Sequence, residues 1–367
     1  MASEGPARTV LMVHDYPPVT GGGLALAVLE LAGLLRGDDH VVVLSSRWRD
    51  HFADDRTRRG PCSTSNADVE VSRVSVWHAV RRFADADLVF THWTFSVRRL
   101  ATAALLLGPL LGKPTVCVVH TAPAHCRYNR MRRVPSRARR TLLNVIARAM
   151  RRCRAVVALS EGHAAALRGI GFPVTHVIPL MVTLPPLAER HRAQPRERAR
   201  IVGVAGELSV LKGADRLPAI VAGLAPDFAF RIAGTGPLED RLRVELSALP
   251  ADVAMCGWVP PESMPDFYRR IDFLLVASRT EAQSRVALEA MLAGVIVVAA
   301  DDCGLASLVD DGVTGVLVDV DDVGAIRERL TELAGHPATM AAITRRACAS
   351  AVGRLDDCRQ RWQRLSV

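Results

Sequence analysis

The sequence predicts an α/β protein in which two Rossmann-like domains, each with a doubly wound parallel sheet, face a cleft. Short apolar runs alternate with longer segments of helical spacing along most of the chain, and this alternation builds parallel sheets covered on both faces. A stretch rich in proline and arginine interrupts the alternation once, over residues 183–200. With 367 residues, 49% of them hydrophobic, the chain is long enough to fill two cores.

The first predicted domain spans residues 1–182. Its candidate strands are short apolar runs, namely Val10–His14, His40–Leu44, Val69–Val74, Leu88–Thr91, Thr115–Val119, Val156–Leu159 and His176–Pro179. Between them, Leu24–Leu35 and Arg139–Met150 repeat apolar residues at helical spacing. Ligands of open parallel sheets bind beyond the carboxyl ends of the strands, so the loops after these strands are where we expect chemistry.

The predicted linker, residues 183–200, contains two prolines in a row and a polar, arginine-rich stretch. Proline removes backbone donors, and nothing in this stretch can build a core. The second predicted domain spans 201–350, with strands at Ile201–Ala205, Ala229–Ala233, Val253–Cys256, Phe273–Ala277, Val295–Ala299 and Gly315–Val318. Residues 351–367 read as a final helix, and packing back on the first domain is one way for it to bury its apolar side.

Composition restricts the class of partner and the compartment. A net charge of +9 suggests an anionic partner, which could be a nucleic acid, a membrane surface or a phosphorylated substrate. Aromatics make up only 5%, which argues against nucleic acid. The eight cysteines are scattered without a Cys-x-x-Cys pair, which predicts reduced thiols and no metal site. Without a signal core or an apolar run of about 20 residues, we expect a cytoplasmic protein.

Two loops carry features that suit a phosphate. Gly21–Gly23 follows the first strand and opens a helix, whose free N–H groups suit an anion, although a plain flexible turn would look the same. The loop from Gly206 to Gly213 holds Lys212, one of only two lysines in the chain. Lysine there would be a point charge for a diphosphate, while a solvated surface lysine is the alternative.

The most specific stretch is residues 278–294, after the strand Phe273–Ala277. Glu281 is expected in the loop and Glu289 on the following helix among apolar neighbours. A carboxylate buried there needs a partner, which ribose hydroxyls could supply, and the N–H groups of Ser284–Val286 could face a phosphate. The alternative is that Glu289 faces solvent on an amphipathic helix.

The order and spacing of these motifs resembles glycosyltransferase family 4, on the two-Rossmann GT-B fold, over essentially the whole chain. The matching pieces are the glycine loop 21–23 and the segments 87–92, 113–120, 156–161, 212–213, 234–237, 257–259 and 311–318, together with Glu281 and Glu289. The resemblance implies sugar transfer from a nucleotide-sugar donor to an acceptor hydroxyl with retention of configuration. It implies no cofactor and no metal, since basic side chains and helix N-termini neutralise the leaving diphosphate.

The resemblance also implies site residues. The catalytic set is His120, Glu281 and Lys212. The donor-binding set is Gly22, Gly23, Glu207, Gly236, Trp258, Val259, Gln283, Ser284, Arg285, Val286 and Glu289, and the acceptor-binding set is His92, Trp93 and His125. A histidine after a strand is more often structural, so the catalytic assignment of His120 depends on its place in the pattern.

Some positions depart from the family pattern. Glu207 stands where the family often has arginine, and Gln283 and Ser284 replace an aromatic residue and a glycine. A carboxylate beside a diphosphate would repel it, so Glu207 either points away or pairs with a cation such as a substrate amino group. We expect a UDP-sugar donor and a small polar or sugar-bearing acceptor, as in bacterial antibiotic biosynthesis of the aminoglycoside kind.

Two alternatives stay open. The basic run Arg127–Arg154 would suit a membrane-peripheral enzyme that acts on a lipid-linked acceptor in cell-envelope glycan synthesis, although a solvated arginine-rich face is the favoured interpretation. The departures from the family pattern would also suit a non-catalytic protein that binds a nucleotide sugar.

Overall fold

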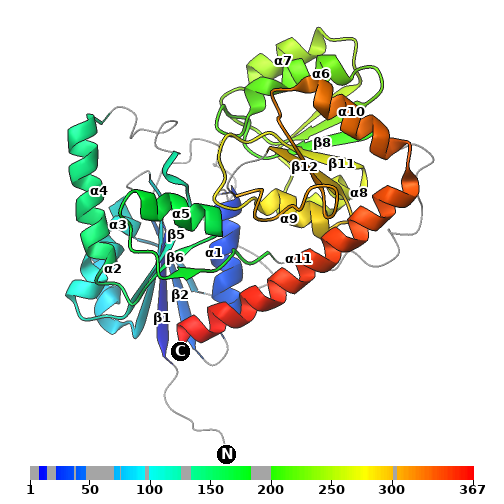
Figure 1. The fold of residues 1–367 in the computed structure, drawn as a ribbon. Coiled ribbons are helices and arrows are strands. Elements are labelled where there is room, and N and C mark those ends of the chain that lie inside the picture. The colour runs from blue at the N-terminus through cyan, green and yellow to red at the C-terminus, as the bar shows by residue number, and fades with distance from the viewer. Residues whose placement is uncertain are drawn as a thin grey trace, which may run out of the picture. The chain divides into compact units, whose positions relative to one another are not determined.

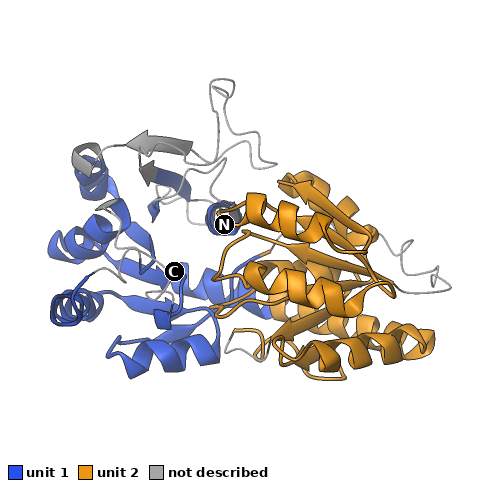
Figure 2. Cartoon of the chain, turned by 90° about the horizontal axis from the view of Figure 1, so that it is seen from above, with its two compact units in different colours: residues 1–181, 357–367 blue, residues 182–356 orange. Residues whose placement is uncertain are grey.

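The computed structural model describes residues 8–14, 22–36, 39–46, 70–74, 76–95, 99–124, 134–182, 200–300 and 304–367. The chain divides into two compact units, shown in different colours in Figure 2. Unit 1 contains Met1–Met181 and Asp357–Val367, and unit 2 contains Val182–Asp356. The predicted linker falls on residues 183–199, outside the described part of the chain, and on Arg200.

Unit 1 contains a seven-stranded parallel sheet in the order β3-β2-β1-β4-β5-β6-β7. The strands are β1 (Thr9–His14), β2 (His40–Ser46), β3 (Glu70–Val74), β4 (Leu88–Trp93), β5 (Thr115–Val119), β6 (Ala155–Ala158) and β7 (His176–Val177). The chain adds strands on one side of β1 and then returns to the other side with β4. The point where the strand order reverses therefore lies between β1 and β4, and such points are where α/β sheets bind ligands.

The helices of unit 1 cover both faces of this sheet (Figure 1). They are α1 (Gly22–Leu35), α2 (Val76–Asp85), α3 (Arg99–Leu110), α4 (Ser136–Met150) and α5 (Glu161–Gly169). One apolar cluster joins α2 and α3 to β1, β2 and β4, and a second joins α3, α4 and α5 to β5 and β6. The residues of β4, β5 and β6 are buried throughout, and so are those of β1 after half-buried Thr9, as expected for parallel strands between two helix layers.

Unit 2 contains a six-stranded parallel sheet in the order β10-β9-β8-β11-β12-β13. Its elements are β8 (Ile201–Ala205), α6 (Leu217–Leu224), β9 (Ala229–Ala233), α7 (Glu239–Ser247), β10 (Val253–Gly257), α8 (Met264–Arg269), β11 (Phe273–Val276), α9 (Arg285–Leu292), β12 (Ile296–Ala300), β13 (Val316–Val318) and α10 (Val323–Ala334). Helices α6, α7 and α10 lie on one face and α8 and α9 on the other (Figure 1). Here the strand order reverses between β8 and β11.

The last helix, α11 (Pro337–Ser366), is longer than the sequence predicts, since it begins well before residue 351. Its final residues pack within unit 1. The indole Nε1–H of Trp362 donates to the carbonyl of Pro179 at 2.8 Å, and the ring lies 6.4 Å from that of Phe90, centroid to centroid. Because Trp362 is only 1% exposed, this end of the helix is part of the unit 1 core.

The fold prediction is confirmed, in that both sheets are parallel, doubly wound and covered by helices. The predicted strands match the observed ones to within one or two residues at each end. Within the described residues, no helix is long and apolar enough to cross a membrane.

Candidate functional site

In unit 2, Lys212 and Glu281 meet beyond the carboxyl ends of β8 and β11, where the strand order reverses. Lys212 Nζ lies 2.6 Å from Glu281 Oε1, and the Ser278 hydroxyl donates to the same oxygen at 2.8 Å. The Glu281 side chain is only 7% exposed, whereas that of Lys212 is 36% exposed. A held carboxylate therefore lies beside an ammonium group that still reaches solvent.

The backbone explains why the two loops meet. Gly213 has φ = +71°, and a Cβ there would collide with the carbonyl oxygen of Ala277 at the end of β11. Only glycine allows the chain after Lys212 to pass so close to that strand end. The Arg279 amide donates to the Leu211 carbonyl at 2.9 Å, which ties the second loop to the first.

Glu289 lies on α9, and two described side chains donate hydrogen bonds to it. Arg285 Nε donates to its Oε1 at 2.6 Å, and the Tyr268 hydroxyl donates to its Oε2 at 2.8 Å. Burial, and then the nearby Glu289 charge, raise the pKa of Tyr268 well above its usual value, so this hydroxyl stays protonated. Glu289 is 6% exposed, which rules out the solvent-facing alternative. A carboxylate has about four acceptor positions, so hydroxyl groups of a ligand could bind beside these donors.

The start of α9 is organised around its N-cap. The Ser284 hydroxyl accepts from the Ala287 amide at 3.4 Å and is 2% exposed, so the side chain serves the helix. Gln283, Arg285 and Val286 are half-buried around it. Of these predicted donor-site residues, Arg285 is the one whose side chain acts on Glu289.

Other predicted donor-site residues lie on neighbouring loops of unit 2. Glu207 is exposed and accepts a hydrogen bond from the Ser209 hydroxyl at 3.2 Å. Gly236 passes so close to the Glu207 loop that a Cβ on it would lie 2.7 Å from backbone atoms of Leu208. Trp258 follows β10 and is 51% exposed, whereas the neighbouring Val259 packs against the core. An exposed indole there leaves an aromatic face open to a base.

In unit 1, four histidines lie at or near the carboxyl ends of β1, β4, β5 and β6; we call His14, His92, His120 and His163 the histidine cluster. His92 Nδ1 and His120 Nε2 are 2.8 Å apart. Burial lowers the pKa of His120 to about 3 and the pKa values of His14 and His163 to about 4. At neutral pH these rings are therefore uncharged.

The structure corrects two predicted acceptor contacts. Trp93 is fully buried and packs its ring edge against Phe95 and Phe172, so it is a core residue and cannot touch an acceptor. His92 is 2% exposed, and its Nδ1 hydrogen-bonds to His120 rather than facing solvent. His125 lies outside the described residues.

Only the last two residues of the predicted glycine loop lie within the described part of the chain. Gly22 is the first residue of α1, and Gly23 is exposed in its first turn. Residues 15–21, which lead into this helix, lie outside the described part of the chain.

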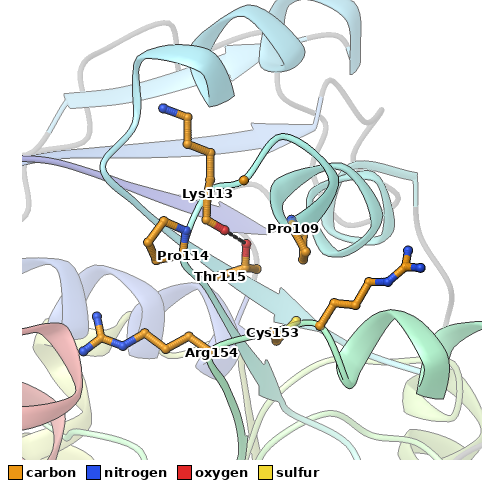
Figure 3. A pocket seen from close by; sticks show the side chains of 8 residues that line it. Pro109, Lys113, Pro114, Thr115, Cys153 and Arg154 are labelled. Carbon is orange, nitrogen blue, oxygen red and sulfur yellow. Dashed lines mark hydrogen bonds between the residues drawn. The ribbon is translucent and has the colours of Figure 1, made fainter.

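A shallow hollow of about 420 Å³ lies at the amino end of β5, away from the strand ends just described. Its lining includes Lys113, Arg152 and Arg154. Figure 3 shows that the side chains of Lys113 and Arg154 point away from each other. These two cations therefore do not converge on one anion in this hollow. Within the described ranges, no three His, Cys, Asp or Glu side chains are placed so that they could hold a metal ion together.

The sequence analysis missed three residues that hold the site together. Ser278 lies two residues after the end of β11, so its position at a strand end was a usable signal. Tyr268 contacts Glu289 across 21 residues, and His163 binds the Thr121 carbonyl next to His120. Nothing in the local pattern around either residue indicates these contacts, because they depend on how helices dock.

Two protein-family models match most of the chain. The model described as Glycosyltransferase Family 4 matches residues 21–184, and the one described as Glycosyl transferases group 1 matches residues 188–349. Among curated proteins, the 2-deoxystreptamine glucosyltransferase of Streptomyces kanamyceticus is 28% identical over 289 residues, which covers 72% of each chain. The D-inositol 3-phosphate glycosyltransferase of Mycobacterium sp. (strain KMS) is 38% identical over 155 residues.

This second match covers 40% of the present chain, which spans only about a third (34%) of that relative's length. Among solved structures, Anabaena HepE in complex with UDP-glucose superposes with a TM-score of 0.74 and 22% identity, over 97% of this chain and 98% of that one. At this identity the superposition demonstrates a shared fold.

Proposed function

The chain belongs to the GT-B glycosyltransferases of family 4, and on this basis we propose that it transfers a sugar from a nucleotide-sugar donor to an acceptor hydroxyl. One observation carries the proposal. Lys212 and Glu281, predicted to hold the diphosphate and the sugar, are in direct contact at 2.6 Å where the strand order of unit 2 reverses. The reaction is proposed to occur in the cytoplasm.

In this proposal Lys212, Glu281 and Glu289, which together form the cluster in unit 2, each have a distinct task. Lys212, whose ammonium group reaches solvent, exchanges part of its contact with Glu281 for the donor diphosphate and neutralises charge as the phosphate leaves. Glu281, held by Ser278, accepts from hydroxyls of the donor sugar. Glu289 accepts from the ribose while Tyr268 and Arg285 keep it in place.

The same proposal includes front-face transfer with retention, in which the leaving phosphate takes the acceptor proton. No protein nucleophile or metal is then required, because positive charge fixed near the developing negative charge lowers the barrier. Product stereochemistry, read from the anomeric coupling of the isolated glycoside, checks this part. An inverted product would reject it.

For the substrates we propose a UDP-sugar and an aminated cyclitol or sugar acceptor. The UDP-glucose bound by HepE and the aminocyclitol named for the Streptomyces relative support this choice. Exposed Glu207, in place of the usual arginine, supplies a carboxylate that would suit a substrate ammonium group. Glu207→Gln should therefore raise the KM for an aminated acceptor but leave the KM for its neutral polyol analogue unchanged.

A second candidate is a membrane-peripheral enzyme with a lipid-linked acceptor. The observation in its favour is that Arg137, Arg140 and Arg148 are exposed on α4, followed by exposed Arg151 and Arg152. Such a face could bind anionic headgroups. Co-sedimentation with phosphatidylglycerol vesicles at low salt tests this candidate, and an unbound protein would remove it.

The decisive experiment is a transfer assay by mass spectrometry with a panel of nucleotide sugars and aminocyclitol acceptors. Glu281→Gln should lower kcat/KM by about 10- to 100-fold, the effect of losing hydrogen bonds to a charged group. Glu245→Gln is the matched control, since it breaks the exposed Arg241–Glu245 ion pair on α7 at a similar 2.7 Å. Equal activity of both variants, or nucleotide-sugar binding without turnover by the wild-type protein, would contradict an enzyme built on this cluster.

A further inference from the structure

His92 and His120 share one hydrogen bond in unit 1, and its direction decides what His120 can offer to a ligand. The bond joins His92 Nδ1 to His120 Nε2 at 2.8 Å. Both rings are neutral at neutral pH because burial lowers their pKa values. In a neutral imidazole one nitrogen carries the proton and the other accepts, so one ring donates and its partner accepts.

The other nitrogen of His92 indicates which ring donates. His92 Nε2 is buried, and no described residue hydrogen-bonds to it. If His120 donated, that nitrogen would carry a buried N–H without an acceptor, and orphaned N–H groups are rare in folded proteins. If His92 donates, its Nε2 is a bare nitrogen.

We propose that His92 donates its Nδ1–H to His120 and thereby fixes His120 in the tautomer that carries its own proton on Nδ1. His120 is half-buried, and no described residue hydrogen-bonds to its Nδ1. A neutral N–H donor is then presented to solvent or ligand. His92 is a positioning residue in this arrangement, since it acts through His120.

The backbone around His120 is held on both sides, so the donor has a fixed place. The His120 amide donates to the Trp93 carbonyl at 2.9 Å. The next carbonyl, that of Thr121, is 3.1 Å from His163 Nε2. Because His163 Nδ1 accepts from the Leu159 amide, its Nε2 carries the proton and donates to Thr121. His163 therefore anchors the chain beside His120.

This inference rests on the proposed function, and it restricts which kind of substrate group His120 can bind. A neutral N–H needs an acceptor, and a hydroxyl or phosphoryl oxygen of a substrate would supply one. A protonated amine there would have no acceptor. His120 with its proton on Nδ1 also has no accessible bare nitrogen and does not act as the base for the acceptor hydroxyl.

The first test reads protonation at each ring nitrogen by heteronuclear NMR of the full-length protein with labelled histidine, assigned by single His→Asn variants. The expected result is a protonated Nδ1 and bare Nε2 in both His92 and His120. A protonated Nε2 in either ring overturns the proposal. This measurement needs no substrate, so it stands whether or not sugar transfer is found.

The second test reverses the hydrogen bond. His92→Asn places an amide N–H where the ring Nδ1–H lies and should keep kcat/KM within about threefold of wild type. His92→Asp offers only an acceptor when ionised, so neutral His120 would turn its Nε2–H inwards and leave Nδ1 bare. The Asp carboxylate also raises the pKa of His120.

The pH profile separates these cases. At low pH the carboxyl group introduced by His92→Asp and the His120 ring together hold one more proton, so His120 again presents Nδ1–H. As pH rises through the titration of this pair, kcat/KM should fall by about tenfold. Among the described residues, the other titratable groups facing His120 are His14 on β1 and His163 on α5, and both are unchanged in the two variants. If the pH profile of His92→Asp follows that of His92→Asn, the proposal is refuted. If the wild-type protein shows no sugar transfer either, the proposed function is rejected instead.

Discussion

Acidification should destabilise unit 1 through its buried histidines, and His163 allows this effect to be measured alone. The ring is fully buried, Nδ1 accepts from the Leu159 amide at 3.2 Å, and Nε2 lies 3.1 Å from the Thr121 carbonyl. Burial lowers its pKa from 6.5 to about 4. Between these values the unfolded chain binds a proton that the folded chain does not, so the free energy of unfolding falls as pH falls.

The size of the effect follows from the shift. One pKa unit corresponds to about 1.4 kcal/mol, so acidification from neutral pH to about pH 5 removes about 2 kcal/mol through His163. The full loss, about 3 kcal/mol, is reached only below about pH 4. The stabilising contribution is present above pH 6.5 because the ring is then neutral in both states.

The perturbation is His163→Asn, which keeps an acceptor for the Leu159 amide but cannot titrate. At neutral pH it should cost about 1 kcal/mol for the lost bond to Thr121. Urea unfolding of both proteins, followed by tryptophan fluorescence, gives the stability difference at each pH. That difference should shift by about 2 kcal/mol in favour of the variant at about pH 5.

An exposed side chain of the same unit that cannot titrate provides the control. Asn144→Ala on α4 should give the same stability difference at both pH values, because neither side chain takes up a proton in this range. If the difference between wild type and His163→Asn were also independent of pH, a neutral buried His163 would be refuted.

Three further outcomes follow from contacts described above. Trp362→Ala removes a buried indole and its bond to Pro179, so urea unfolding should show a loss of about 3–5 kcal/mol; a loss below about 1 kcal/mol would contradict a core position. Tyr268→Phe deletes one hydroxyl that holds Glu289, and should raise the KM for the donor by about 5- to 10-fold with little change in melting temperature. An unchanged KM would show that this hydroxyl does not support donor binding. Gly236→Ala brings a methyl to 2.7 Å from the facing loop and should lower the melting temperature by several degrees; an equal or higher melting temperature would show that the loop yields.

Much of the fold could be predicted because most strands are short apolar runs buried on both faces. The run Thr115–Val119, for example, coincides with β5 residue for residue. The start of α11 could not be predicted in the same way. Residues 337–350 pack partly in the unit 2 core, with Ile343 and Ala347 buried there, so their pattern reads as part of the second domain.

Where strand ends alone decide the geometry, the sequence could indicate which residues lie together. Lys212 and Glu281 follow the neighbouring strands β8 and β11, so their contact follows from topology. The same reasoning failed for His92 and Trp93 because β4 continues beyond Thr91 to Trp93, which keeps both side chains inside the sheet layers. Tyr268 was missed because its contact with Glu289 depends on the docking of α8 against α9.

The central claim is that the cluster of Lys212, Glu281 and Glu289 binds a nucleotide diphosphate. Titration calorimetry with UDP tests it most directly, on the wild type and on one variant of each lysine. UDP should bind wild type and Lys113→Gln alike, since Lys113 lines the separate hollow in unit 1, and should bind Lys212→Gln at least about tenfold more weakly. Equal UDP affinity in all three proteins, or no binding to any of them, would contradict the claim.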